Sequence, residues 1–550
     1  MTMKKTILGF AFLLLVGCLW AKDVIIYHTT DMHGHYFSRA DKSGKQFGGF
    51  ARLASLLNST QDPYILLDSG DFSSGSYEAN LSGGKYSTEL MNMVGYTALT
   101  IGNHDSDFGD KGLSDMLADF DGDVLAMNIS NLKVANKNIK PHALYNVDGI
   151  KIGVIGVAMN GSASERMAIV NAPSTEEFEA QISALKRKGA QVIVILAHDS
   201  MLAGGNVSKD KRTNILDPIQ HAPSFGDVSL LLGGHAHTQT LVGKITDNSG
   251  RGPWVLESAP YMGSITKIVV SQDDETGKIT IAEPQFIKLT GSEDPEVKAY
   301  LKSIREDELD NTVYARVPKL ITKYPAADQL DRAPSVARLM ADQMYKKISK
   351  YEKVDLTAYS LNSTRSDYNP GDLTGRYFAE MTPYEEHSGT FNITGQHLLK
   401  AMLESIGYRN DKCYSVYGYS KNVHIVFTCN KGNPKIDKVT IDGKPVRPNK
   451  TYRMGMLTHL PRGFYEGKPF QIMPSDAVDD GSVIKHYRDI TSSAMLFGII
   501  EQAREDQNKD VPNFVAPSDI QIEESTEFDK KIGKSLKSAQ KQVDKMMKGQ

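Results

Sequence analysis

Residues 102–109 read GNHDSDFG and follow directly after YTALTI (96–101), an apolar run of strand-forming residues. An amide, an imidazole and two carboxylates therefore stand where a strand is expected to end, on Asn103, His104, Asp105 and Asp107. Gly-Asn and Asp-Ser pairs also form ordinary turns, so this segment alone has two readings. A buried chain rarely needs an amide, an imidazole and two carboxylates side by side, and the residues after the other expected strands decide between turn and site.

Short β-rich runs alternate with helical patterns from residue 23 to about residue 289. Because the runs are nearly continuous apolar stretches, they are typical of strands covered on both faces. They are DVIIYH (23–28), YILLDS (64–69), YTALTI (96–101), KIGVIGV (151–157), QVIVILAH (191–198) and VSLLLGG (228–234). The helical patterns between them include GGFARLASLLNS (48–59) and TEEFEAQISALKRKG (175–189). The alternation predicts a layered α/β domain.

Side chains that commonly bind metals follow five of these runs. In open α/β sheets, ligands bind at the carboxyl ends of the strands, so we expect these residues to lie together. They mix oxygen and nitrogen donors, a combination that suits two divalent cations better than one. The set comprises Asp31 and His33 in TTDMHGH, Asp71, Asn103, His198, and His235 and His237 in GGHAH.

Each of these residues also has an ordinary structural interpretation when it is taken singly. Asp31 or Asp71 could cap a helix, and a lone histidine such as His198 is more often simply hydrogen-bonded. The recurrence of such residues after five expected strands is what favours a site. Three neighbouring residues are expected to support the fold rather than bind metal: His28 in the first strand, His35 in a loop, and Asp105 as a turn residue or supporting acceptor.

A second domain is expected after DPEVKAYLKSIREDELDN (294–311), whose helical periodicity and charged face predict a linker helix. Beyond it, helical and strand patterns mix, which indicates an α+β arrangement. Helices are expected at SVARLMADQMYKKI (335–348) and GQHLLKAMLESIGY (395–408), and strands at HIVFTC (424–429), KVTIDG (438–443) and TYRMGM (451–456). A chain of 550 residues is long enough for two or more cores.

The N-terminus carries lysines followed by the apolar run TILGFAFLLLVG (6–17), which predicts an export signal and is too short to span a membrane comfortably. Cleavage after Ala21 is the preferred reading. The alternative is a bacterial lipoprotein box with the lipid on Cys18, but the first strand is expected to start near Val24, which leaves almost no tether. The mature protein is therefore expected to be exported to the periplasm or cell envelope.

The remaining bulk features say less about function. The formal net charge of -3 provides no global field that would attract nucleic acid or acidic membranes. After signal cleavage, Cys413 and Cys429 would remain, and an exported pair can form a disulfide. Their geometry cannot be read from the sequence, so both outcomes stay open. The basic stretch 526–550 has a helical pattern and is expected to be a solvated tail, with an envelope contact as the weaker alternative.

The motifs D-M-H, G-D, G-N-H-D, A-H and G-G-H-A-H, in this order and on these runs, resemble those of the calcineurin-like metallophosphoesterases. The longer patterns HTTDMHGH (28–35) and GNHDSDFG, followed by a second domain, resemble the bacterial 5'-nucleotidase family. The resemblance covers nearly all of the mature chain, and it is specific in the first domain and loose in the second. It implies an α/β fold in which a four-layered α/β/β/α metallophosphoesterase domain is joined by a linker helix to a mixed α+β C-terminal domain.

The resemblance divides the chain into five parts. These are a signal peptide at 1–21, a metallophosphoesterase catalytic domain at 22–290, a linker with a helix at 291–332, a substrate-binding 5'-nucleotidase-like domain at 333–525, and a basic helical tail at 526–550.

The resemblance also implies two divalent metal ions, drawn from Zn, Mn, Co or Mg. Asp31, His33, Asp71 and His237 would hold one ion, and Asp71, Asn103, His198 and His235 would hold the other. Asp71 would then bridge the two ions. His237 departs from relatives that carry glutamine at this position, and an imidazole also ligates metal.

The chemistry that this implies is phosphoester hydrolysis. Two cations about 3.5–4 Å apart bind one water as a bridging hydroxide near neutral pH, and this hydroxide attacks phosphorus in line. His104 and Asp107 match the histidine and aspartate pair of the family. His104 would serve the leaving group and a phosphoryl oxygen, while Asp107 would orient the imidazole and favour its cationic form. This assignment would explain the crowding of polar groups in GNHDSDFG.

In the second domain, Asn362 and Arg365 resemble the family's N-G-G-G-I-R segment, shortened by two glycines. Arg365 is the preferred phosphate ligand, with a surface salt bridge as an equal alternative. Tyr417 or Tyr419 lies where the family has a stacking aromatic, although either could be an ordinary strand tyrosine. The segment RGFYEG lacks the aspartate of the family's G-G-D-G-[FY] motif. The candidate substitutes are Phe464 and Tyr465.

The sequence therefore predicts an exported hydrolase that releases phosphate from nucleoside 5'-monophosphates or related phosphoesters. Alternatives within the family are a 2',3'-cyclic nucleotide phosphodiesterase, a nucleotide-sugar hydrolase and a sulfur-ester hydrolase. An alternative of another class is a catalytically silent nucleotide-binding envelope protein. The expected partner is a nucleotide or another small phosphoester, and neither nucleic-acid binding nor a transmembrane segment is expected.

Overall fold

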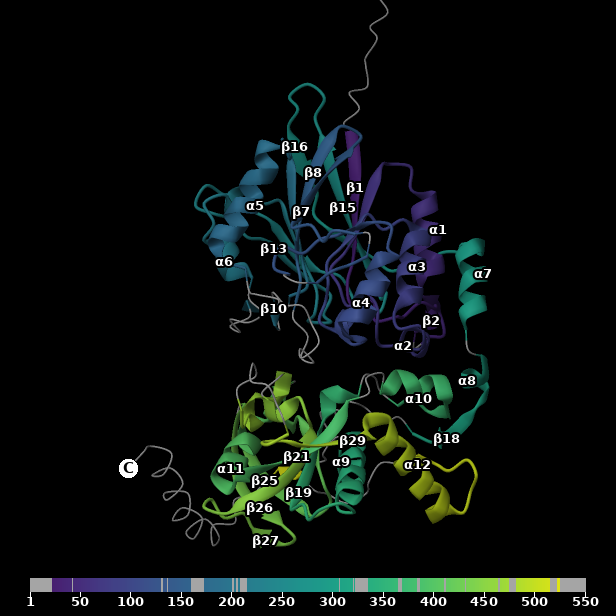
Figure 1. Cartoon of the computed structure of the whole chain (residues 1–550), viewed down its shortest axis with the longest axis vertical. Helices are drawn as coiled ribbons and strands as arrows, with labels where there is room; N and C mark the ends of the chain where they lie inside the picture. Colours follow the sequence, from purple (N-terminus) through teal and green to yellow (C-terminus); the bar gives the residue numbers. More distant parts are fainter. Residues whose placement is uncertain are drawn as a thin grey trace, which may run out of the picture. The chain divides into compact units, whose positions relative to one another are not determined.

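The apolar runs of the first half become the strands of two stacked sheets in the computed structural model (Figure 1). The structure describes residues 22–41, 43–129, 132–135, 137–159, 173–199, 202–203, 206–207, 215–305, 307–319, 321, 335–364, 368–382, 386–409, 412–430, 432–462, 465–473, 481–514 and 522–524. The expectations on the signal peptide, on Cys18 and on the basic tail lie outside these residues. The described residues fall into two compact units: those of 1–72, 87–160 and 168–301 form the first, and those of 73–86 and 302–550 form the second.

The first sheet of the first unit is mostly parallel around β1, with an antiparallel edge. Its order is β16 (Ile279–Ile281), β15 (Ile265–Gln272), β1 (Lys22–Thr29), β4 (Tyr64–Asp68), β5 (Ala98–Leu99) and β6 (Asp123–Val124), and β17 (Gln285–Ile287) also pairs with β15. The second sheet has the order β13 (Thr240–Lys244), β14 (Trp254–Glu257), β12 (Leu230–Gly233), β9 (Val192–Ala197), β8 (Ile150–Val157) and β7 (His142–Val147). Its inner strands β8, β9, β12 and β14 are parallel.

Alternation along the strands builds the core between the two sheets. Val24 and Ile26 of β1 belong to the same buried cluster as Val154 of β8 and Val194 of β9, while Ile155 faces the opposite side of its sheet. Successive residues of a strand point to opposite faces, so every second residue of each strand fills this layer. Burial on both faces is why the runs in the sequence are continuously apolar.

Helices cover the outer faces of both sheets. Figure 1 shows α1 (Phe50–Ser59) and α3 (Lys85–Val94) on one side of the first unit, and α5 (Thr175–Arg187) and α6 (Leu216–Gln220) on the other. A capping box at Ser174 and Glu177 starts α5, and Phe178, Ile182 and Leu185 pack against the second sheet. The layers run helix, sheet, sheet, helix, which confirms the predicted four-layered fold.

The second unit is the predicted mixed α+β arrangement. Its main sheet has the order β24 (Tyr417–Tyr419), β19 (Leu356–Ser360), β28 (Thr451–Leu457), β21 (His387–Thr394) and β29 (Lys485–Thr491). A smaller sheet joins β27 (Lys444–Pro445), β26 (Asn433–Ile441), β25 (Val423–Asn430) and β30 (Ile522–Glu524), and its helices are α9 (Ser335–Ile348), α10 (Gly375–Met381), α11 (Gly395–Glu404) and α12 (Ser492–Gln507).

Shorter elements complete the described chain. The α-helices are α2 (Tyr77–Leu81) and α4 (Gly109–Ala118), and the short 3₁₀-helices are η1 (His104–Ser106), η2 (Phe225–Asp227), η3 (Leu361–Ser363), η4 (Leu460–Arg462) and η5 (Tyr465–Phe470). The strand pairs are β2 (Arg39–Ala40) with β3 (Gln46–Phe47), β10 (Leu202–Ala203) with β11 (Asn206–Val207), β18 (Val313–Val317) with β20 (Gly371–Thr374), and β22 (Ile406–Arg409) with β23 (Lys412–Ser415).

Three elements differ from the sequence-based expectation. The strand expected over 96–101 has only two paired residues, because the chain leaves the sheet after Leu99 to form the GNHDSDFG turn. The helix expected over 395–408 ends at Glu404, because Ile406–Arg409 pairs with Lys412–Ser415 as a hairpin. The expected linker helix is two helices, α7 (Pro295–Ile304) and α8 (Asp307–Asn311).

Cys413 and Cys429 form a disulfide with their Cα atoms 6.1 Å apart. It joins β23 of the hairpin to β25 of the smaller sheet. The structure thereby resolves the question of pairing that the sequence leaves open. Within the described ranges, no helix is both long enough and apolar enough to cross a membrane.

Candidate metal and catalytic centre

The seven candidate ligands lie in loops that leave the carboxyl ends of five strands. Asp31 and His33 follow β1, Asp71 follows β4, Asn103 follows β5, His198 follows β9, and His235 and His237 follow β12. Because β1, β4 and β5 are parallel neighbours in one sheet and β9 and β12 are parallel neighbours in the other, the loops of each sheet leave it at one end. The donor groups join residues of both sheets, so these two ends lie together.

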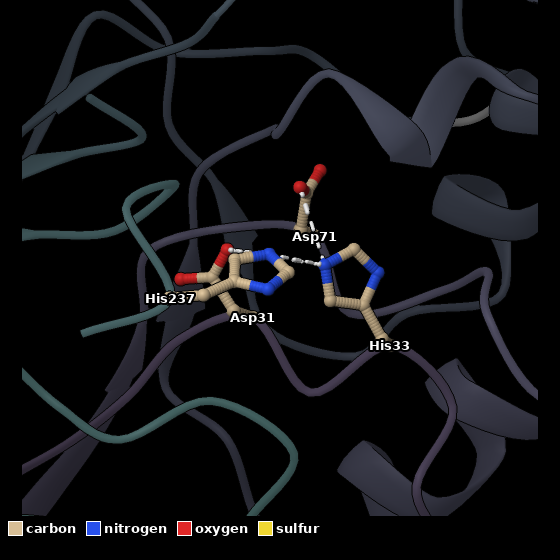
Figure 2. Close-up of side chains that lie close together, drawn as sticks. All are labelled: Asp31, His33, Asp71 and His237. Atoms are coloured by element: carbon tan, nitrogen blue, oxygen red, sulfur yellow. Dashed lines mark hydrogen bonds and ion pairs between the residues drawn. The ribbon is translucent and has the colours of Figure 1, made fainter. Parts of the chain in front are cut away.

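Four of these side chains form a first group, in which nitrogen and oxygen atoms face one another (Figure 2). His33 Nε2 lies 3.0 Å from His237 Nε2 and 3.5 Å from Asp71 Oδ2. His237 Nε2 lies 3.2 Å from Asp31 Oδ1. Asp31, His33 and Asp71 are buried, and His237 is half-buried at the rim of the site.

A second group shares Asp71 with the first. His198 Nε2 lies 3.1 Å from Asp71 Oδ2 and 3.2 Å from Asn103 Oδ1. His235 Nδ1 lies 2.9 Å from the same Asn103 oxygen. Within each group of carboxylate and imidazole donors, the candidate ligand atoms all lie within 4.8 Å of one another. One carboxylate therefore takes part in two convergent donor sets.

The backbone at these positions is strained in a recurrent way. Ten non-glycine residues in the described part of the chain have positive φ angles, and half of them are candidate ligands: Asp31 (50°), His33 (48°), Asp71 (56°), His235 (75°) and His237 (52°). A left-handed conformation costs a non-glycine residue about 1–2 kcal/mol. Such conformations persist where the surrounding structure enforces them and gather at functional sites. Here they turn the side chains inward at the strand ends.

Supporting hydrogen bonds hold the ligands in place. The Asp105 carboxylate is buried and accepts hydrogen bonds from the backbone N–H groups of Asp71 (2.8 Å), Phe72 (3.0 Å) and Gly102 (2.8 Å). It thereby joins the Asp71 loop to the GNHDSDFG turn, and of the two roles that the sequence left open for Asp105 it is the supporting acceptor. His198 Nδ1 lies 2.7 Å from the carbonyl oxygen of Ser69 and donates to it, which leaves Nε2 directed at the site.

His28 and His35 lie beside the centre without joining either donor group. His28 is hydrogen-bonded through both ring nitrogens to Ser258 and Ser69, and burial lowers its pKa to about 3. It is therefore a neutral structural histidine, as expected. The His35 ring packs 4.6 Å from the Tyr261 ring, and burial together with Arg39 lowers the His35 pKa to about 3.

The charges in the centre are strongly coupled. Burial would raise the pKa of the Asp71 carboxyl, but His198, His104 and His33 outweigh it and hold that pKa well below its usual range. Burial lowers the pKa of His33 well below its ordinary value and that of His235 to about 3. Burial would also lower the pKa of His198, but the adjacent Asp71 carboxylate outweighs burial and raises the His198 pKa to about 10. A divalent ion bound here would displace that proton.

The donor atoms fit a divalent cation. Asp71 Oδ2 is buried and accepts no hydrogen bond of good geometry. His33 and His237 point their Nε2 atoms at each other across 3.0 Å, an arrangement in which two lone pairs repel unless a proton or a cation lies between them. Imidazole nitrogens and carboxylate oxygens are the donors that Zn²⁺ and similar ions prefer. The chemistry of the donor set thus matches a metal centre.

His104 and Asp107 lie beside this centre at the more exposed end of the same turn. His104 Nδ1 lies 2.9 Å from Asp107 Oδ2, and the two side chains are 17% and 28% exposed. The backbone N–H of His104 donates to Asp71 Oδ1 at 2.7 Å. His104 is therefore hydrogen-bonded to the shared Asp71 carboxylate through its backbone and to Asp107 through its ring.

The predicted substrate residues of the second unit are less informative. Asn362 lies in η3 and donates its backbone N–H to Ser360 Oγ at 3.0 Å. Tyr417 and Tyr419 are fully buried in the core of that unit, so neither ring face is exposed for stacking in this structure. Arg365 and Phe464 lie outside the described residues, and their proposed roles stay predictions.

Sequence reasoning missed Tyr261. This residue lies in the loop after β14, and its hydroxyl is 2.9 Å from His237 Nδ1. The segment WVLE that precedes this loop is a further short apolar strand, so the rule that found the other loops would have pointed to SAPYMGS (258–264) as well.

Comparisons with known proteins identify the families that the two parts of the chain resemble. A family model for the calcineurin-like phosphoesterases matches residues 25–239, and one for the 5'-nucleotidase C-terminal domain matches residues 319–468. The NAD 5'-nucleotidase of Haemophilus influenzae is 26% identical over 458 residues, which cover 70% of this chain and 73% of that protein.

Two solved structures have the same two-domain fold. A 5'-nucleotidase precursor from Thermus thermophilus has a TM-score of 0.69 at 18% identity and covers 92% of this chain and 100% of its own. A sulfate thiohydrolase from Thermus thermophilus has a TM-score of 0.63 at 14% identity and covers 92% of this chain and 97% of its own.

Proposed function

We propose that this chain, which belongs to the bacterial 5'-nucleotidase family of calcineurin-like metallophosphoesterases, releases phosphate from nucleoside 5'-monophosphates or closely related phosphoesters. Members of this family are metal-dependent hydrolases of phosphoric esters. The observation that carries the proposal is the pair of donor groups that share the buried Asp71 carboxylate. A silent nucleotide-binding protein would have no need for two strained, buried donor sets beside a histidine and aspartate pair.

We assign one divalent ion to each donor group. Asp31, His33, Asp71 and His237 would hold the first, and Asp71, Asn103, His198 and His235 the second. Two such ions, when bound, activate a water molecule as the nucleophile near neutral pH and neutralise charge on the phosphoryl oxygens. The carboxylates and imidazoles of these groups would orient the ions and exclude bulk water from the donor atoms.

His104 would act on the substrate itself. Its Nδ1 is hydrogen-bonded to Asp107, and Nε2 would face the phosphoryl group or the leaving oxygen. Asp107 keeps the imidazole in one orientation and stabilises its protonated form. In this scheme, His104 donates a proton or hydrogen bond to the oxygen that departs from phosphorus.

The second domain would bind the rest of the substrate. We propose the boundaries 22–290 for the catalytic domain and 333–525 for this domain. Arg365 would hold a phosphate oxygen and Phe464 would pack on the nucleoside, while Asn362 supports the segment that carries Arg365. The apolar run after the N-terminal lysines supports export to the periplasm or envelope.

The decisive experiment is reconstitution and then a substrate screen. The protein is stripped with a chelator and titrated with Zn²⁺, Mn²⁺, Co²⁺ or Mg²⁺, and p-nitrophenyl phosphate hydrolysis is measured with metal content. Two ions per chain and recovery of activity are expected. The loaded enzyme is then tested on nucleoside monophosphates, NAD, cyclic nucleotides, nucleotide sugars and thiosulfate esters. A loaded enzyme that hydrolyses no phosphoester would refute the proposal.

A further inference from the structure

The loop after β14 contacts the first donor group, although none of the seven candidate ligands lies in it. Tyr261 lies in this loop, and its hydroxyl is 2.9 Å from Nδ1 of His237. The other ring nitrogen of His237, Nε2, faces Asp31 Oδ1 at 3.2 Å and His33 Nε2 at 3.0 Å. The two nitrogens of one imidazole therefore have separate partners.

This division matters because a neutral imidazole carries its single proton on one nitrogen only. Nε2 can give a lone pair to a cation only when the proton lies on Nδ1. When Nδ1 carries the proton, the Tyr261 hydroxyl oxygen lies at the right distance to accept its hydrogen bond. This is the tautomer that a cation at Nε2 requires, and a hydrogen-bond acceptor at Nδ1 would stabilise it.

Tyr261 is held firmly enough to have this effect. Its backbone N–H donates to the carbonyl oxygen of Asp31 at 2.8 Å, so the loop is attached to a ligand residue. Tyr261 and Met262 both have left-handed backbones, with φ angles of 58° and 55°. The Tyr261 ring packs against those of His35, His33 and His237, with centroids 4.6, 5.7 and 5.2 Å away.

We propose that Tyr261 is a positioning residue that fixes the tautomer and orientation of His237 and thereby sets the affinity for the ion held by Asp31, His33, Asp71 and His237. The inference rests on the metal assignment proposed above. It depends on His237 being an imidazole, because a glutamine side chain at this position would have no ring tautomer to select.

The test measures metal binding directly. Chelator-treated full-length protein is titrated with Co²⁺, and the dissociation constants are read from the visible absorption spectrum and from calorimetry. Tyr261→Phe, which keeps the ring, should weaken one of two sites by about 10–100-fold, the usual effect of losing a group that supports a ligand. Tyr145→Phe is the matched control, since it removes a hydroxyl bonded to Asp123 elsewhere in the first unit. It should bind Co²⁺ as the wild type does.

A double-mutant cycle separates tautomer control from loop shape. In the His237→Gln background, Tyr261→Phe should change the Co²⁺ affinity little further. An equal loss in both backgrounds, or an unchanged affinity in Tyr261→Phe alone, would overturn the proposal.

Spectroscopy of the unmutated residue gives a second test that does not depend on how the variants fold. The spectra are ¹⁵N-histidine correlation spectra of the zinc-loaded protein, and the His237 resonance is assigned by its loss in His237→Gln. This resonance should show a proton on Nδ1. A proton on Nε2 would refute the inference. If the wild-type protein binds no Co²⁺, the metal assignment itself is wrong. If the wild type binds Co²⁺ and Tyr261→Phe binds it equally well, only the proposed role of Tyr261 is wrong.

Discussion

The amide, the imidazole and the two carboxylates of the turn at 103–107 each make separate contacts. Asn103 faces His198 and His235, and His104 is held by Asp107 while its backbone N–H binds Asp71. The Asp105 carboxylate accepts three backbone hydrogen bonds that join this turn to the Asp71 loop. A proposed metal ligand, a proposed acid–base group, its proposed orienting carboxylate and a structural acceptor therefore lie within five residues. This explains a density of polar groups that an ordinary turn does not need.

Asp71→Asn should lower both metal content and activity. The substitution removes the charge that both donor groups share, so we expect fewer than two ions per chain and little p-nitrophenyl phosphate hydrolysis. Elemental analysis and turnover measure these effects. Asp217→Asn, on a side chain that is 73% exposed, is the control. Two bound ions with near wild-type turnover would disprove the bridging role.

His104→Asn should keep both ions and lose about 10²–10⁴-fold in turnover, the range typical of general acid–base groups. Asp107→Asn should lose less, because it only orients and charges the imidazole. If His104 protonates the leaving oxygen, a nucleoside monophosphate should suffer more than p-nitrophenyl phosphate, whose phenolate leaves with little protonation.

Comparison of kcat for the two substrates decides how His104 acts. Equal losses would place the action of His104 on the phosphoryl oxygens instead. No loss with both ions retained would make it a bystander.

At the scale of secondary structure, the candidate functional groups lie in short loops after strands. Side-chain contacts between neighbouring strands stabilise the sheets. The strand before GNHDSDFG pairs over only two residues, which frees the chain to form the turn. In the second unit, Glu352 lies just after α9 and accepts hydrogen bonds from Thr390 of β21, Arg453 of β28 and Tyr487 of β29. One carboxylate thus contacts three neighbouring strands.

Glu352 should make stability depend on acid pH. Burial would raise its pKa, but the hydrogen bonds from Thr390, Tyr487 and Arg453 outweigh burial and lower it to about 2. Because the unfolded value is about 4.3, this contribution is present above pH 4.3 and is lost as the pH falls from there through about 2. Glu352→Gln should therefore cost about 1 kcal/mol at pH 7, after allowance for solvent screening, and progressively less below pH 4.

Urea unfolding of the two proteins at several pH values measures this difference. A constant difference between pH 7 and pH 3 would contradict the assignment.

The disulfide should stabilise the second unit. Cys413 and Cys429 are separated by 16 residues, and closing a loop of this length is worth about 3 kcal/mol in the chain-entropy model. The double variant Cys413→Ala with Cys429→Ala should unfold at a lower denaturant concentration than the wild type. Dithiothreitol should lower the stability of the wild type and leave the double variant unchanged. Equal stability of the oxidised wild type and the double variant would show that the bond contributes nothing.

At the scale of the whole molecule, all seven candidate ligands and the His104–Asp107 pair belong to the first unit. The proposed substrate residues belong to the second part of the chain. Metal binding and recognition of the nucleoside should therefore respond to different substitutions. This separation offers a route to test the two assignments independently.

Arg365→Ala should raise KM for a nucleoside monophosphate without changing metal content. The guanidinium would hold a substrate phosphate and lies in the sequence far from every candidate ligand, so the two ions should remain. Arg488→Ala, at an exposed position of β29, is the matched control. An unchanged kcat/KM on every phosphoester in the screen would make Arg365 an ordinary surface residue.

Much of the fold and the candidate centre could be predicted from the sequence. Continuous apolar runs such as QVIVILAH become strands that are buried on both faces. A strand with one face in water would instead alternate apolar and polar residues. The residues directly after them, Asp71 and His198 among others, come together because parallel strands end at one edge of a sheet. The residue order alone thus determined the α/β class, the layered first domain and the members of the donor set.

The tertiary structure decided the features that depend on contacts between distant segments. The 395–408 segment has helical periodicity, but pairing with Lys412–Ser415 turns its end into a strand. The disulfide required two strands to place Cys413 and Cys429 within 6.1 Å, a distance that spacing does not encode. Burial of Tyr417 and Tyr419 and the contact of Tyr261 with His237 likewise depend on how separate elements pack. Local pattern specifies the residues of an element and the loop directly after it, whereas partners far apart in the chain are specified only by the folded arrangement.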